Sequence, residues 1–216
     1  MFTYSFMTDG IPVIYQGQEQ HLSGKSSDNS NREAIWTSGY NVNSFLYKHI
    51  AALNNIRTHA IRMDSTWTTS SAQVAYQDQH VLAMAKGPAS SRTMVVVNNN
   101  GADGSAYTVS MPLDASKAFA ANTGLTEILT CNTATVGSDG KLNVPISKGA
   151  PNIYFPTANL KGSGLCGTTK TTNSGTSASS GAASSSTSAT KNGAASVRVG
   201  KVGAVLVAVA VGFMLL

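Results

Sequence analysis

The sequence predicts an α/β unit followed by an all-β domain, and three observations support this division. Up to about residue 62, a continuous apolar run, a long polar loop and a helical apolar pattern follow one another. From about residue 64, short β-rich runs recur between glycine-containing turn signals. From residue 167 on, the chain is rich in Ser and Thr and then ends in an apolar tail. The predicted domains are 1–62, 63–166, 167–191 and 192–216.

The first domain contains one strand pattern and one long helix pattern. Residues 2–7 resemble the last turns of a helix, and Asp9-Gly10 is a turn signal. Residues 11–15 form an apolar run typical of a strand that is buried on both faces in a parallel sheet. Asn43-Ser44 offers a cap for a helix over residues 45–62, whose apolar side chains recur every three or four positions. A single such unit cannot cover both faces of its own strand.

The second domain consists of short runs with the composition of β-strands. Turn signals separate them, notably Gly101–Gly104 and Gly137–Gly140. Short strands at this spacing predict an antiparallel β-sandwich or Greek-key unit. The predicted strands are 73–76, 80–86, 93–98, 106–111, 125–130, 141–144 and 152–155.

The two cysteines of the chain, Cys131 and Cys166, are predicted to form a disulfide. An even pair in a chain with a cell-surface signal indicates an oxidising compartment. The bond would close a loop of about 35 residues and contribute about 3–4 kcal/mol in the loop-entropy model. The spacing does not suit a metal site, which needs closely placed Cys or His ligands.

The apolar tail, residues 202–216, carries no charge. As a helix it would be about 22 Å long, shorter than the roughly 30 Å hydrocarbon core of a bilayer. Small residues beginning at Asn192 and a short polar spacer precede it. This order predicts a glycosylphosphatidylinositol (GPI) attachment signal, with Asn192 or its neighbour Gly193 as the attachment residue. A tail-anchored apolar helix is the alternative.

Residues 167–190 are nearly all Ser, Thr, Ala, Gly and Asn. Without large apolar side chains they cannot offset the entropy of ordering, so we expect a disordered, O-glycosylated stalk. The stalk and the anchor signal predict a protein held at the cell surface or in the cell wall, on the outer leaflet of the plasma membrane. Residues 1–10 lack a secretory leader, which suggests that the chain is incomplete.

Charge excludes one class of partner. The net charge is +5, only 12% of residues are charged, and the Lys and Arg residues are scattered. This distribution does not indicate a nucleic-acid-binding surface. We expect a monomer.

A motif near the N-terminus gives a family resemblance. Gly10, Pro12, Tyr15, Gly17 and Glu19 form a Gly-x-Pro-x-x-Tyr-x-Gly-x-Glu pattern, followed by the string Asn-Arg-Glu-Ala at 31–34. The pattern resembles the fungal α-amylases of glycoside hydrolase family 13, the Taka-amylase type, and the similarity covers about residues 1–166. It implies the last βα unit of a (β/α)8 barrel, an amylase C-terminal β-sandwich, and a disulfide spaced like Cys131 and Cys166. The stalk and tail resemble the surface-anchored subgroup, some members of which are 4-α-glucanotransferases.

The resemblance also implies that the catalytic carboxylates are absent. Family enzymes retain anomeric configuration with two carboxyl groups about 5–5.5 Å apart, and these residues come from earlier barrel strands. None of the ten acidic residues of this chain lies in a motif that matches those positions. The structural calcium ligands of the complete enzyme also lie upstream, so no cofactor is expected within this chain.

Two residues are candidates for substrate contact. Asp28 and Arg32 match an Asp-x-x-x-Arg pattern that binds glucose units in the family, and both can form charge-assisted hydrogen bonds with sugar hydroxyls. The alternative is a surface ion pair. Glu19 is expected to hold loops rather than to catalyse, and His21 to form hydrogen bonds. The aromatic residues Trp36, Tyr40 and Trp67 are interpreted as core or interface residues, with sugar stacking as the alternative.

The resulting prediction is the C-terminal portion of an α-amylase-type enzyme that acts on α-1,4-glucans such as starch, glycogen or cell-wall α-glucan. We expect the chain alone to be inactive. Two alternatives stay open: part of a GPI-anchored 4-α-glucanotransferase, and a non-catalytic surface β-sandwich module.

Overall fold

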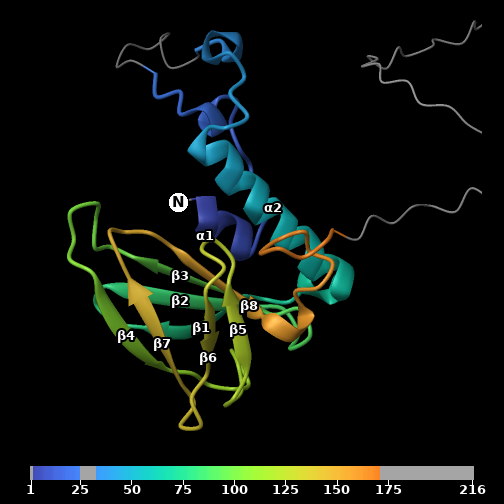
Figure 1. Cartoon of the computed structure of the whole chain (residues 1–216), viewed down its shortest axis with the longest axis vertical. Helices are drawn as coiled ribbons and strands as arrows, with labels where there is room; N and C mark the ends of the chain where they lie inside the picture. Colours follow the sequence, from blue (N-terminus) through green and yellow to red (C-terminus); the bar gives the residue numbers. More distant parts are fainter. Residues whose placement is uncertain (1, 25–32, 171–216) are drawn as a thin grey trace, which may run out of the picture. The chain divides into compact units, whose positions relative to one another are not determined.

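A computed structural model describes residues 2–24 and 33–170, which belong to one compact unit (Figure 1). The predicted sugar contacts Asp28 and Arg32, the attachment residue Asn192, the stalk from residue 171 and the apolar tail lie outside the described residues. The elements are α1 (Phe2–Met7), η1 (Gln18–Gln20), η2 (Ile35–Ser38), α2 (Phe45–Met63), η3 (Ser65–Trp67), β1 (Gln73–Gln77), β2 (Val81–Lys86), β3 (Thr93–Asn98), β4 (Tyr107–Pro112), β5 (Gly124–Glu127), β6 (Thr133–Thr135), β7 (Lys141–Ile146), β8 (Asn152–Pro156) and η4 (Thr157–Asn159).

The long helix pattern is confirmed as α2. Its apolar stripe buries Leu53, Ile56 and Ala60, as an amphipathic helix does when it packs on a core. The cap differs from the prediction, because the Ser44 side chain makes no capping hydrogen bond. Its hydroxyl donates instead to the carbonyl oxygen of Glu19, at 2.7 Å. In the described part of the chain, no helix has the length and apolar character needed to cross a membrane.

The prediction of an antiparallel two-sheet domain is also confirmed. Six strands form one sheet in the order β1-β2-β3-β8-β5-β6, and β4 pairs with β7 in a second sheet. Every pairing between these eight strands is antiparallel. The sequence pattern missed β6, which has only three residues and pairs with β5.

The central strands β3 and β8 of the six-stranded sheet are buried on both faces. Along β3, Met94 and Val96 point into the core between the two sheets, whereas Val95 points into the core beneath α1 and α2. The helices lie over this second face in Figure 1. The core between the sheets contains Val81, Ala83, Ala85, Met94, Val96, Met111, Ala118, Phe119, Leu125, Val136, Leu142, Val144, Ile146 and Tyr154. The core under the helices contains Phe6, Met7, Leu53, Ile56, Ala60, Trp67, Val95, Ile128, Ile153, Phe155 and Leu160.

The strand predicted over residues 11–15 does not form. The segment has no strand assignment, and Ile11 and Val13 are 89% and 83% exposed. A strand needs a neighbour for its N–H and C=O groups, and none of the described residues pairs with this segment. Within the described part of the chain, the prediction of a buried strand at 11–15 is therefore wrong.

The predicted disulfide joins Cys131 and Cys166, whose Cα atoms are 5.2 Å apart. Cys131 follows β5, and Cys166 lies beyond η4 near the end of the described residues. The bond ties the segment after η4 back to the sheet.

Candidate functional site

The loop after the exposed apolar segment is held by its own glutamate. A carboxylate oxygen of Glu19, Oε2, accepts the backbone N–H of Gly17 at 3.0 Å. Gly17 has φ +89°, and a Cβ there would lie 2.5 Å from Cδ1 of Leu22, so the turn requires glycine. Glu19 therefore acts as the loop-holding residue that the sequence predicted.

A second set of contacts ties this loop to the start of α2. Gln20 accepts the backbone N–H of Asn41 at 2.8 Å and donates to the Asn41 carbonyl at 3.3 Å. His21 Nε2 accepts the backbone N–H of Leu46 at 3.4 Å, and the Ser44 hydroxyl binds the Glu19 carbonyl. His21 thus forms a hydrogen bond within the loop cluster, as expected.

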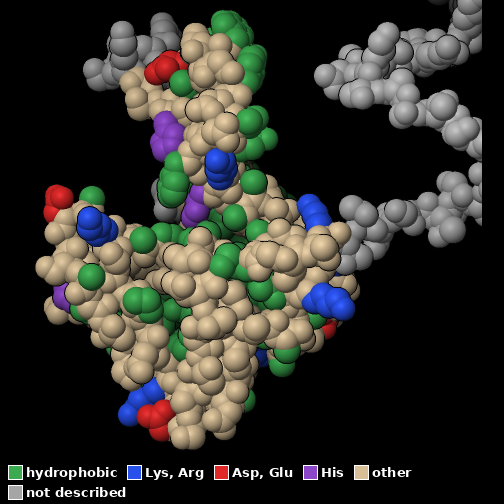
Figure 2. Space-filling model, in the orientation of Figure 1, with side chains coloured by type: hydrophobic (Ala, Val, Ile, Leu, Met, Phe, Trp, Pro, Cys, Tyr) green, Lys and Arg blue, Asp and Glu red, His purple; other side chains and the backbone are tan. Residues whose placement is uncertain are grey.

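Aromatic side chains surround this loop without being buried. Tyr15, Trp36 and Tyr40 are all more than half exposed. Figure 2 shows hydrophobic side chains on the surface around the part of the molecule where α2 begins. Trp36 and Tyr40 are therefore not core residues within the described unit, whereas an interface role and sugar stacking stay predictions. Trp36 and Tyr40 are exposed for the same reason as Ile11: the described residues leave most of these side chains uncovered.

An ion pair joins the N-terminal segment to the six-stranded sheet. Nζ of Lys86 lies 2.6 Å from Oδ1 of Asp9, and Lys86 also donates to the carbonyl oxygen of Ser70. The backbone N–H of Ala72 donates to both Asp9 oxygens, at 3.0 and 3.1 Å. The Lys86 side chain is 3% exposed and that of Asp9 is 55% exposed. Lys86 is thus a buried cation whose partners come from two other segments.

Trp67 completes this junction. The guanidinium carbon of Arg57 lies 4.9 Å from the centre of the Trp67 ring, and Nζ of Lys86 lies 5.1 Å from it. Arg57 also donates to the carbonyl oxygen of Phe6 at 2.6 Å. A Cβ on Gly87 would lie 2.2 Å from the indole, so this position must lack a side chain. The interpretation of Trp67 as a core or interface residue is confirmed by its complete burial.

Sequence reasoning missed this junction, although one signal was present. Lys86 closes the run over residues 80–86 on the same face as Leu82 and Met84. A lysine at the buried end of an apolar strand needs an acidic partner. The sequence analysis identified Asp9 only as a turn residue. Its role as the partner of Lys86 depends on the folded path of the chain, because the two residues are 77 positions apart in the sequence.

Replacement of Asp9 should destabilise the fold, because the buried Lys86 loses its charged partner. We expect Asp9→Asn to lower the free energy of unfolding by about 2 kcal/mol at pH 7, since the Lys86 ammonium loses its carboxylate. The hydrogen bonds from Lys86 and Ala72 hold the Asp9 pKa below its usual range. Asp9 therefore stabilises the fold above the unfolded-state pKa of about 4, and this contribution is lost as the pH falls through the folded-state pKa. Urea unfolding at pH 7 and at successively lower pH measures both effects.

The matched control is Asp139→Asn, which breaks an exposed ion pair with Lys141 whose charged atoms are 3.4 Å apart. It should change stability little. A difference between wild type and Asp9→Asn that stays constant down to pH 2 would contradict the role given to the Asp9 charge.

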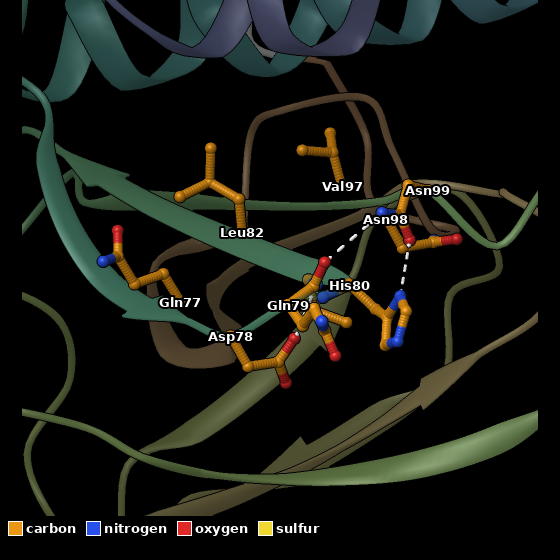
Figure 3. A pocket seen from close by; sticks show the side chains of 9 residues that line it. Gln77, Asp78, Gln79, His80, Leu82, Val97, Asn98 and Asn99 are labelled. Carbon is orange, nitrogen blue, oxygen red and sulfur yellow. Dashed lines mark hydrogen bonds between the residues drawn. The ribbon is translucent and has the colours of Figure 1, made fainter.

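A surface pocket of about 500 Å³ lies at the turn between β1 and β2 (Figure 3). Asp78 accepts the backbone N–H of His80 and the hydroxyl of Tyr76, both at 2.7 Å. These bonds, the backbone one first, hold the Asp78 pKa below its usual range. His80 Nδ1 lies 3.0 Å from Oδ1 of Asn99, whose amide also donates to the Gln79 carbonyl. The polar groups bind one another, so the arrangement is that of a closed hairpin turn.

Other acidic side chains also cap turns. Asp64 accepts the N–H and hydroxyl of Thr66, at 3.0 and 2.6 Å, and Asp114 binds Ser116 in the same way. These bonds, the side-chain one first, lower the pKa of both carboxyl groups. Within residues 2–24 and 33–170, no group of three His, Cys, Asp or Glu side chains is arranged to hold a metal ion.

The all-β part has a recognisable counterpart. Residues 74–174 match the family model described as "Alpha-amylase, domain C". This part of the chain is an α-amylase C-terminal domain. Over 163 residues the chain is 44% identical to alpha-amylase 2 of Schwanniomyces occidentalis, and over 154 residues it is 44% identical to the alpha-amylase of Saccharomycopsis fibuligera. These matches cover 76% and 71% of this chain, and 31% and 29% of the two relatives.

A solved structure shows the same similarity. The α-amylase from Malbranchea cinnamomea is 41% identical, with a TM-score of 0.69, over 76% of this chain and 33% of that one. This chain thus spans about a third of the length of the relatives that it matches. The fungal relationship inferred from the N-terminal motif is confirmed.

Proposed function

We propose that this chain is the C-terminal portion of an α-amylase-type enzyme that cleaves α-1,4-glucosidic bonds in starch-like glucans. In this proposal, residues 1–62 complete a (β/α)8 barrel and residues 63–166 form its C-terminal sandwich domain. The observation that carries the proposal is the exposed apolar segment between α1 and α2, with Ile11 and Val13 open to solvent. A parallel barrel strand is apolar on both faces because neighbouring strands and helices cover it.

The extent of the similarity supports the same proposal. The match to the Schwanniomyces enzyme covers 163 residues, whereas only 143 run from residue 74 to the end of the chain. The similarity therefore extends upstream of the C-terminal domain, into α2. The hydrogen bonds that Glu19 forms with Gly17 and Ser44, and Gln20 with Asn41, would shape a loop at the open end of the barrel, where barrel enzymes place their active sites.

Asp28 and Arg32 would belong to that loop. We propose that they bind glucose units next to the cleaved bond, with the carboxylate accepting from sugar hydroxyls and the guanidinium donating to others. The catalytic carboxylate pair would come from the part of the barrel that precedes this segment, as would the ligands of any calcium ion. The chain by itself is therefore proposed to be inactive.

The anchor signal adds a location to the proposal. Attachment of a lipid at Asn192 would hold the enzyme at the cell surface, where starch, glycogen-like or cell-wall α-glucans are reachable substrates. A surface-anchored 4-α-glucanotransferase is the second form of the same proposal, because hydrolysis and transfer share the retaining carboxylate chemistry.

A domain replacement tests the function. In the chimera, residues 1–170 of this chain replace the matching segment, about a third, of Schwanniomyces alpha-amylase 2. The reducing sugar that the chimera releases from starch is measured. We expect the chimera to hydrolyse starch and the 216-residue chain alone to release none. In the chimera, Asp28→Ala should raise KM for short maltooligosaccharides by about tenfold, since a charged hydrogen-bond partner of the sugar is lost.

Two outcomes would contradict the proposal. One is starch hydrolysis by the isolated chain, which would require a carboxylate pair within it. The other is a folded chimera without activity, because a segment that completes the barrel should restore it. Tight retention of the isolated chain on insoluble starch, combined with an inactive chimera, would favour the non-catalytic surface module.

A further inference from the structure

The sandwich contains a partly enclosed pocket that the proposed function does not use. Its volume is about 280 Å³, near the lower end of the range for small-molecule sites. Strands β6, β7 and β8 and the turns next to them line it. The residues that matter for the argument are Asn132, Thr133, Asn143, Pro145, Pro151 and Tyr154.

Tyr154 is the most informative of these residues. Its side chain belongs to the core between the two sheets, and the residue is only 1% exposed. Buried tyrosine hydroxyls usually find a hydrogen-bond partner. No described residue forms a hydrogen bond with this hydroxyl, which is not among the fully buried unpartnered atoms and is therefore open to the pocket that Tyr154 lines. Burial, and secondarily the Glu127 charge, raises the pKa of Tyr154, so the phenol stays protonated and can donate.

The acid beside it is not available to a ligand. Glu127 Oε1 accepts the backbone N–H groups of Leu129 and Ile153, at 3.2 and 2.9 Å. Its Oε2 accepts the N–H and hydroxyl of Thr130, both at 2.7 Å. These four bonds occupy the lone pairs of the carboxylate, which leaves no vacant oxygen for a cation. No lysine or arginine lines the pocket either, so nothing in it selects an anion.

The remaining surface is neutral and mixed in character. Within the described part of the chain, the side-chain amides of Asn132 and Asn143 have no hydrogen-bond partner, and both lie on the pocket wall. Pro145 and Pro151 supply flat apolar surface beside them. Uncharged amides and hydroxyls next to small apolar faces match a sugar ring, which has hydroxyl groups at its edge and C–H groups on its faces.

We propose that this pocket binds one or two pyranose units of a neutral oligosaccharide, with the Tyr154 hydroxyl and the amides of Asn132 and Asn143 as hydrogen-bonding groups. The choice of an α-glucan as the ligand rests on the proposed function. The site itself rests on the unpartnered phenol and the neutral wall. It would give the sandwich domain its own contact with the polysaccharide.

Titration of the purified 216-residue chain with maltotriose, followed by ¹H–¹⁵N NMR, tests the site. We expect shifts at backbone amides of the turns around residues 132 and 143. Tyr154→Phe keeps the ring and removes only the hydroxyl, so it should weaken binding by about tenfold. Asn143→Ala, at an exposed position of β7, should weaken binding by several fold without touching the core. Tyr107→Phe, on an exposed tyrosine of β4, is the matched control and should leave binding unchanged.

Unchanged affinity in both Tyr154→Phe and Asn143→Ala would overturn the site, as would an absence of maltotriose-dependent shifts around the pocket. Because Asn143→Ala leaves the core intact, a folding defect in Tyr154→Phe would not decide the question. The starch assay on the chimera is read separately. An active chimera with no maltotriose binding at this pocket would reject the second site while the proposed enzyme function stood.

Discussion

Trp67→Ala is expected to lower the free energy of unfolding by about 4 kcal/mol. Truncation of a fully buried tryptophan typically costs about 3–5 kcal/mol, because transfer free energy is lost and a cavity is left. Trp67 has no solvent exposure, and its ring contacts two cations, Arg57 and Lys86. Each such contact adds about 0.5–1 kcal/mol or more when desolvated. Chemical denaturation followed by far-ultraviolet circular dichroism measures the loss.

Two matched variants sharpen this test. Trp36→Ala removes an exposed indole, 69% accessible in the described unit, and should change stability by less than about 0.5 kcal/mol. Trp67→Phe keeps most of the ring volume and also removes an indole N–H that is buried without a partner. It should therefore cost much less than alanine. If Trp67→Ala and Trp36→Ala proved equally mild, Trp67 could not be the centre of the junction.

Loss of the disulfide is expected to destabilise the protein by about 3–4 kcal/mol in the loop-entropy model, because the bond closes a loop of 35 residues in the unfolded chain. The bond also holds the segment after η4, where Leu165 and Cys166 pack against the core under the helices. The double variant Cys131→Ala/Cys166→Ala and the wild type are compared by urea unfolding, with and without a reductant.

The single alanine variants and the response to reductant are the controls for the disulfide prediction. Either single alanine variant should lose as much stability as the double variant, because one cysteine cannot form the bond. Reductant should destabilise the wild type and leave the double variant unchanged. A wild type whose stability does not respond to reduction would contradict a structural role for the bond.

Much of the fold was predictable because burial follows periodicity. The runs at 93–98 and 152–155 gave β3 and β8 to within one residue, and the helical stripe gave α2 to within one residue. The short strand β6 has only three residues, too few to show alternation, and it is stabilised by pairing with β5. Local pattern cannot show such a strand.

The site was less predictable, for two physical reasons. The run at 11–15 has the sequence of a buried strand, but a strand forms only where another strand supplies hydrogen-bond partners, and sequence does not show which partners are present. The Asp9–Lys86 pair joins residues 77 positions apart, and such pairing depends on the folded path of the chain. The role of Glu19, by contrast, acts within two residues and was predicted correctly.

The alternation along β3 has a consequence for how this domain tolerates change. Met94 and Val96 pack in the core between the two sheets, and Val95 packs in the core under the helices. Neighbouring residues of β3 therefore belong to different cores. Substitutions at Met94 and Val96 can change the packing between the two sheets, whereas substitutions at Val95 can change the packing of the helices on the sheet. A shared sheet of this kind lets the packing under the helices change while the interior between the two sheets stays the same.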